Sequence, residues 1–159
     1  MRVSLRIALV VAVLVASLFV LRRFGQKPDV KAGPGLGELM SLQQMRHAKL
    51  WLAGQAGNWE LAAYEIKELN EGFDDVVRLH PTHEGSPVDP KDAVPMMMTG
   101  PLEALGQAVA KQSPADFATA FDELTTGCNG CHEATNFGFN QVQRPSANPY
   151  PNQVFERVR

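Results

Sequence analysis

The sequence contains very little cysteine: two residues among 159, Cys128 and Cys131. Both lie in the run Cys128-Asn129-Gly130-Cys131-His132, and two cysteines this close together cannot connect distant loops. A fold held together by disulfide bonds is therefore excluded. The spacing is typical of three other kinds of site: a redox dithiol, half of a zinc site, or a covalent haem-attachment site.

The chain also lacks an excess of basic residues, with 15 Lys and Arg against 17 Asp and Glu and a formal net charge of −2. Several of the basic residues are at the N-terminus, so the rest of the chain is more acidic still, and we expect no binding to nucleic acid. The basic N-terminal residues are Arg2, Arg6, Arg22 and Arg23. Paired carboxylates, nucleophile–base sets and phosphate-binding loops are missing, so we expect the protein not to be an enzyme.

Only one long apolar run is present, over residues 7–21. Arg2 and Arg6 precede it, which is the layout of an export signal. No small-residue cleavage site follows, and Arg22 and Arg23 stand where a signal peptidase would need one, so a retained anchor is favoured over a cleaved signal. We expect residues 1–24 to be a signal peptide or membrane anchor. The domain is then periplasmic, or otherwise outside the cytoplasmic membrane.

Strand-like alternation of apolar residues is almost absent after this segment. Residues 25–35 are rich in Gly, Pro and charge and read as a linker, residues 36–135 contain four helical segments, and residues 136–159 form an extended, proline-containing tail. Four helices with mostly short connections predict an all-α, antiparallel up-down four-helix bundle.

The helix boundaries follow from capping residues and prolines. The first helix is expected over residues 36–55, and the second begins after Asn58 and ends before His80. The third is expected to be short and to begin at Pro101, after a polar loop over residues 81–93.

The fourth helix has the clearest start and carries the motif. Ser113 is its expected N-cap, Pro114 takes the first position, and the helix runs to about residue 134. At 100° per residue, the apolar stripe and the motif share one face of this helix. The residues on this face are Phe117, Phe121, Leu124, Cys128, Cys131 and His132.

A covalent haem suits this face. Two thiols can add across the two vinyl groups of a haem, and the adjacent imidazole can reach its iron. We therefore predict one haem c per chain, bound covalently by Cys128 and Cys131, with His132 as the proximal iron ligand. A thioredoxin-like dithiol is disfavoured because no strand precedes the motif, and zinc is disfavoured because no second pair of ligands has matching spacing.

With Cys128, Cys131 and His132 near the end of a fourth helix in an exported bundle, residues 36–135 resemble the class II c-type cytochromes, the cytochrome c-prime family. The resemblance implies that the sixth iron position faces the first helix. It also implies that this position holds either a methionine, which gives an electron-transfer haem, or an apolar residue, which gives a gas-binding haem.

The first helix offers two candidates for the distal iron ligand. Antiparallel order places the start of the first helix beside the end of the fourth, and Met40 lies near that start, with His47 about two turns further on. Thioether and imidazole both bind haem iron well. We favour Met40, with His47 as the alternative, and a haem without a protein ligand on this side also remains open.

The sequence as a whole predicts a c-type cytochrome that transfers electrons outside the cytoplasmic membrane. The alternative is a gas-binding or gas-sensing haem protein, and a small haem peroxidase ranks third. The expected partners are redox proteins and, through the N-terminal segment, the membrane. A homodimer is compatible with the sequence.

Overall fold

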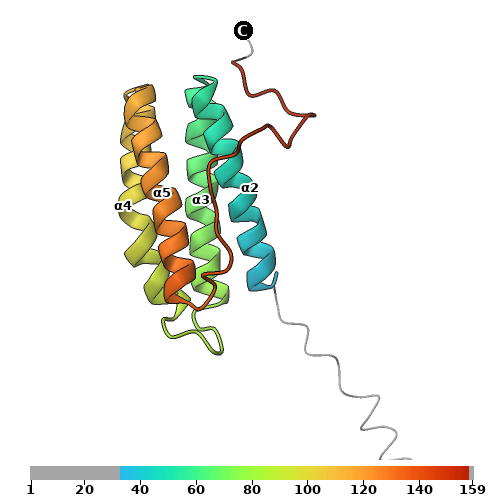
Figure 1. The fold of residues 1–159 in the computed structure, drawn as a ribbon, viewed down its shortest axis with the longest axis vertical. Coiled ribbons are helices and arrows are strands. Elements are labelled where there is room, and N and C mark those ends of the chain that lie inside the picture. Colours follow the sequence, from blue (N-terminus) through green and yellow to red (C-terminus); the bar gives the residue numbers. More distant parts are fainter. Residues whose placement is uncertain (1–32, 158–159) are drawn as a thin grey trace, which may run out of the picture. The chain divides into compact units, whose positions relative to one another are not determined.

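The computed structural model describes residues 33–157, in which four α-helices form a bundle without strands (Figure 1). In chain order the helices are α2 (Leu36–Gln55), α3 (Trp59–Leu79), α4 (Pro90–Ala110) and α5 (Pro114–Ala134). Each helix packs on the next, and α5 packs back on α2. The predicted all-α four-helix bundle is confirmed. The predicted signal or anchor, residues 1–24, lies outside the described residues, as does the linker up to residue 32.

Short connections make neighbouring helices antiparallel, so α2 begins, α3 ends, α4 begins and α5 ends at the same end of the bundle, here called the lower pole (Figure 1). This is the arrangement that places the start of the first helix beside the motif. Between residues 33 and 157, no helix is both long enough and apolar enough to cross a bilayer.

Local capping explains where three of the helices begin. The Glu38 carboxylate accepts from the Gly35 N–H at the start of α2, at 2.9 Å. Asn58 Oδ1 accepts from Leu61 N–H at the start of α3, and Ser113 Oγ accepts from Asp116 N–H at the start of α5. These side chains satisfy amide groups that have no partner within the helix. The predicted boundaries of these three helices agree with the structure.

The predicted start of the third helix was wrong. Instead of beginning at Pro101, α4 begins at Pro90 and contains both Pro95 and Pro101 in its interior. Each internal proline removes one backbone hydrogen bond. The helix continues because its apolar face is buried against α3 and α5 through Val94, Met98, Leu102, Leu105 and Val109. Tertiary burial here outweighs the local preference of proline.

The upper part of the bundle is filled by aromatic side chains. Phe117 and Phe121 of α5 are fully buried, and Trp51 of α2 packs on both, with ring centroids 6.1 and 4.8 Å away. Phe117 lies directly against Gly54, where a side chain would collide with the ring. This dense packing occupies the core above the motif.

The C-terminal tail is extended, as predicted, but it is also packed along the bundle. From the lower pole it runs upward across the α2–α5 side (Figure 1). Arg144 forms an ion pair with Asp122 of α5 and lies 4.2 Å from the ring centroid of Trp51. Farther along, Phe155 is 5% exposed, and its carbonyl accepts from Asn58 Nδ2. The tail is therefore part of the folded domain.

Candidate functional site

A cavity of about 370 Å³ lies between the helices near the lower pole. This volume is within the ~300–1,000 Å³ of typical small-molecule sites. Apolar side chains from all four helices form most of its wall, and no Lys, Arg, Asp or Glu lines it. Its apolar lining includes Leu36, Leu69, Phe73, Val76, Val94, Met98 and Leu124.

Every site residue predicted from the sequence lines this one cavity. Cys128, Cys131 and His132 contribute from α5, and Met40 and His47 contribute from α2. The motif and the two candidate distal ligands lie on the last and first helices of the bundle, so only the antiparallel packing brings them together. With His83 and Met98, the lining combines two thiols, three imidazoles and two thioethers with an apolar wall.

The two cysteines are free thiols. Burial, together with the neighbouring Cys131 thiol, raises the pKa of Cys128 to about 12. Burial also raises the pKa of Cys131. Both groups are therefore protonated at neutral pH, which disfavours thiolate chemistry, because a reactive dithiol needs a lowered pKa.

His132 has a fixed orientation and tautomer. Its Nδ1 hydrogen-bonds the carbonyl oxygen of Asn140 in the tail. A carbonyl can only accept, so Nδ1 carries the hydrogen, and in the neutral ring Nε2 is the nitrogen with the lone pair. A histidine that donates from one nitrogen to a backbone carbonyl is arranged to bind a metal through the other.

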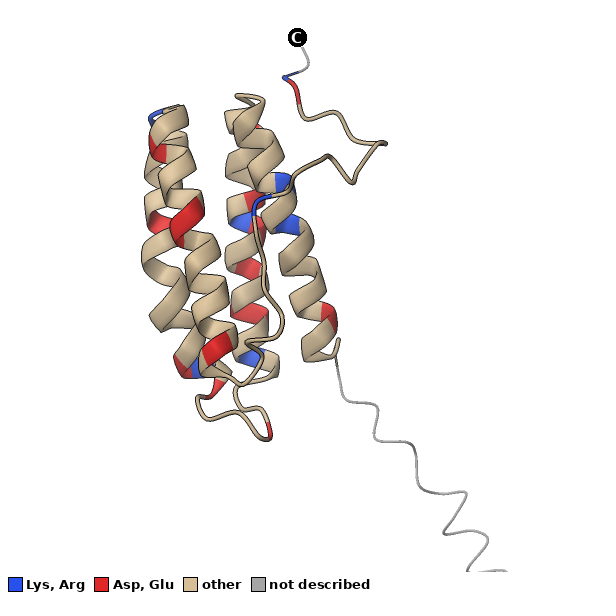
Figure 2. Ribbon diagram, in the orientation of Figure 1, with Lys and Arg blue, Asp and Glu red and all other residues tan. Residues whose placement is uncertain are grey.

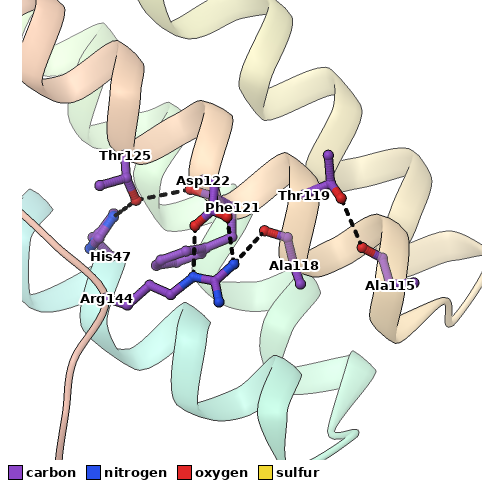
Figure 3. A network of polar contacts seen from close by, with 8 residues as sticks. All are labelled: His47, Ala115, Ala118, Thr119, Phe121, Asp122, Thr125 and Arg144. Carbon is purple, nitrogen blue, oxygen red and sulfur yellow. Dashed lines mark hydrogen bonds and ion pairs between the residues drawn. The ribbon is translucent and has the colours of Figure 1, made fainter.

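His47 is buried at 4% exposure and already has a polar partner (Figure 3). Its Nε2 lies 2.9 Å from Thr125 Oγ1, and that hydroxyl donates to the carbonyl of Phe121. The hydroxyl hydrogen is thus occupied, so Thr125 accepts from the Nε2–H of His47. Burial lowers the pKa of His47 to about 4, so the ring is neutral at pH 7.

Met40, in contrast, is partly buried against the core, and it lines the cavity. Because it has no N–H or O–H group to satisfy, its sulfur can face the cavity without loss of a hydrogen bond.

Four further histidines and methionines lie in or near the wall of this cavity or outside it. His83 lines the cavity wall and packs against Phe137, with ring centroids 5.5 Å apart, and His80 bonds the carbonyl of Pro34. Met98 is a buried wall residue, whereas Met96 is 63% exposed.

The nearest basic residues of α2 are also engaged elsewhere. Arg46 pairs with Glu68 of α3, and Lys49 lies over the ring of Tyr150 in the tail.

The sequence did not predict that residues of the C-terminal tail line the cavity. Phe137, Asn140 and Val142 line the cavity, and Asn129, between the two cysteines, bonds the backbone of Val142. Nothing in the tail's composition distinguishes these residues from those of an unpacked tail. The one feature that could have indicated this contact is Asn129 between the cysteines, because an Asn side chain can hydrogen-bond an extended backbone.

Within residues 33–157, no group of three or more His, Cys, Asp or Glu side chains could hold a metal ion by itself. The cavity is thus not a zinc site built from side chains alone. Comparison of the chain with protein-family models, with curated proteins and with solved structures gave no match.

Proposed function

We propose that the protein is a c-type cytochrome that transfers electrons outside the cytoplasmic membrane. Cys128 and Cys131 would hold one haem through thioether bonds, and His132 would bind its iron through Nε2. When bound, the haem supplies reversible one-electron chemistry at its iron. The observation that carries the proposal is an apolar cavity that both cysteines and the histidine of the Cys-x-x-Cys-His motif line together.

The residues around the cavity fit a large apolar cofactor. The wall has no charged side chain, the thiols are neutral, and His132 presents a lone pair after donating from Nδ1. A wall without charge stabilises an apolar ring by excluding water from it. The chain's own contribution is to position these groups and to keep solvent from most of the site.

Electron transfer is favoured over gas binding because Met40 faces the cavity from the opposite helix. Met40 would hold the iron of the proposed haem from the side away from His132, and a haem with two protein ligands would serve electron transfer. His47 is less suited to this position, because its Nε2–H is committed to Thr125. Met40 is therefore our candidate distal ligand.

The charge distribution bears on the partner. Acidic side chains are spread over all four helices (Figure 2), and the whole chain has a net charge of −2. A redox partner with a basic docking surface would associate with this domain faster than an acidic one, because opposite charges steer the encounter.

Covalent attachment is the test of the proposal. We expect haem to stay on the polypeptide when the exported protein is denatured and extracted with acidified organic solvent, and the Cys128→Ala, Cys131→Ala double variant to lose it. Release of haem from the wild-type chain would contradict the proposal. Spectra of both oxidation states, with and without carbon monoxide, then separate the two functions. A high-spin protein that binds carbon monoxide readily would favour gas binding.

The proposed location depends on residues 1–24. We propose that they carry the domain across the cytoplasmic membrane and keep it anchored there, on the grounds of the apolar run and the arginines that follow it. N-terminal sequencing of the mature protein tests this, because a new start near residue 26 or beyond would show that the segment is removed.

A further inference from the structure

Asn129 is the first of the two residues between the cysteines, and its side chain is joined to the tail by two hydrogen bonds. Asn129 Nδ2 donates to the carbonyl of Val142 at 2.9 Å, and the Val142 N–H donates to Asn129 Oδ1 at 2.8 Å. A carboxamide presents one donor and one acceptor side by side, which matches the N–H and C=O of an extended residue. This reciprocal pair fixes Val142 against the last part of α5.

Two residues before Val142, the tail contacts the motif again. The carbonyl of Asn140 accepts from His132 Nδ1. The position of this carbonyl depends on the short segment between Phe137, whose N–H donates to the His132 carbonyl, and Val142. Gln141 adds one longer contact to the helix, 3.4 Å from its Nε2 to Glu133 Oε1. The Asn129–Val142 pair is therefore the firm downstream anchor of this segment.

We propose that Asn129 is a positioning residue: through Val142 it holds the Asn140 carbonyl on His132 Nδ1, and thereby sets the orientation, tautomer and basicity of His132. The consequence for an iron ligand rests on the proposed function, whereas the linkage between Asn129 and the His132 ring does not. The motif thus contributes a fourth side chain to the site, in addition to Cys128, Cys131 and His132.

The linkage has a direct chemical consequence. A carbonyl that accepts from Nδ1–H increases the electron density on Nε2, and a more basic axial imidazole stabilises ferric over ferrous iron. Release of the tail would replace this fixed carbonyl by mobile water. The midpoint potential should then rise, and the Nδ1 hydrogen should exchange with solvent more rapidly.

Asn129→Ala tests the inference on the full-length protein, with Asn70→Ala as the matched control. Asn70 Nδ2 also donates to a carbonyl, that of Ile66, but within α3 and away from the motif. We expect Asn129→Ala to keep covalent haem, because both cysteines and the histidine are unchanged. It should show a more positive midpoint potential and at least tenfold faster exchange of the His132 Nδ1 hydrogen in NMR spectra. Asn70→Ala should change neither.

A second variant covers the case in which Asn129→Ala fails to fold or to acquire haem. Val142→Pro removes the tail donor and leaves the helix unchanged, so it should produce the same two shifts. If the wild-type chain carries no haem, the ¹⁵N shifts of His132 in the haem-free chain still report its tautomer. A change from the Nδ1–H tautomer in Asn129→Ala would then support the linkage although the cytochrome proposal had failed. The inference would be overturned if the midpoint potential, the His132 tautomer and the exchange rate of its Nδ1 hydrogen were all the same in the variants as in the wild type.

Discussion

Met40 and His47 lie on the same helix and line the same cavity, yet their side chains differ in what they must satisfy. His47 is buried and donates to Thr125, so using it as an iron ligand would require the ring to turn and to abandon that bond. An unpaired buried donor costs about 1–3 kcal/mol. Met40 has no such requirement. For the proposed haem, hydrogen bonding therefore favours Met40 over His47 as the distal ligand.

We expect Met40→Ala to open the sixth iron position. The ferric protein should change from low-spin to largely high-spin, lose the weak red charge-transfer band of a methionine–haem bond, and bind carbon monoxide readily. Absorption spectra of both oxidation states measure each of these. His47→Ala is the control and should keep the band. The reverse result, with loss of low-spin character only in His47→Ala, would assign the ligand to His47.

The buried His47 also predicts a pH dependence of stability. Burial lowers its pKa from 6.5 to about 4, so between these values the unfolded chain binds a proton that the native chain does not. The free energy of unfolding should fall as the pH drops from about 6.5 to about 4, by up to ~3 kcal/mol from this residue, and level off below. Urea unfolding at several pH values should show a smaller fall for His47→Gln. Parallel curves for variant and wild type would contradict the assignment.

At the scale of the elements, α4 shows what sequence can and cannot predict. Helix caps such as Asn58 and Ser113 act over a few residues, so they can be recognised in the sequence. The starts of α3 and α5 were therefore predicted correctly. Pro95 and Pro101 are equally easy to recognise, but they do not end the helix, because the apolar face of α4 is buried against two other helices. Such burial depends on residues distant in the sequence, and no local pattern contains it.

The motif behaves in the same way. Its helix and its face could be predicted because they are local. The presence of Met40 in the same cavity could be predicted because antiparallel order follows from short connections. The hydrogen bond between His47 and Thr125, and that between His132 and Asn140, could not. Both depend on side-chain orientations that are fixed only when the packed chain is complete.

Packing between α4 and α5 predicts the effect of a single methyl group. A Cβ on Gly127 would lie 2.7 Å from the carbonyl oxygen of Met97, a backbone atom that cannot move aside cheaply. This carbonyl has no helical hydrogen bond, because Pro101 lacks the N–H that would donate to it. Gly127 approaches the same carbonyl so closely that position 127 has no space for a side chain. We expect Gly127→Ala to destabilise the domain by about 1–3 kcal/mol.

Thermal or urea unfolding measures this difference, and α4 supplies the control. A Cβ on Gly106 would meet nothing within 4 Å. Gly106→Ala should therefore stabilise the domain by up to ~1 kcal/mol through helix propensity alone. Equal and stabilising effects of the two substitutions would show that α4 and α5 are not in close contact at Gly127.

At the scale of the whole molecule, the tail joins the lower pole to the other end of the bundle. Asn140 contacts His132 at the lower pole, Arg144 contacts Asp122 and Trp51 half-way along, and Phe155 is buried near Asn58. An exposed ion pair contributes little by itself, so the apolar contacts must supply most of the attachment. The α2–α5 interface is the smallest between neighbouring helices, and the tail packs over this side of the bundle.

The two adjacent tail residues Val154 and Phe155 test this attachment. Phe155 is 5% exposed and Val154 is 63% exposed, so truncation to alanine removes buried apolar contacts at one position and hardly any at the other. Burial of a Phe side chain is worth about 1.5–3 kcal/mol, and each 1.4 kcal/mol lost raises the detached population about tenfold. Hydrogen exchange of peptides from residues 145–157, which contain the bonded amides of Tyr150 and Gln153, should therefore accelerate about tenfold or more in Phe155→Ala.

In the same variant, exchange in the four helices should stay at the wild-type rate, because the four-helix core does not depend on the end of the tail. Val154→Ala is the control, and its tail peptides should also exchange at the wild-type rate. Uniform acceleration across all four helices would instead mean that the tail is required for the bundle itself, and unchanged exchange in Phe155→Ala would mean that Arg144 and the lower-pole contacts hold the tail without it.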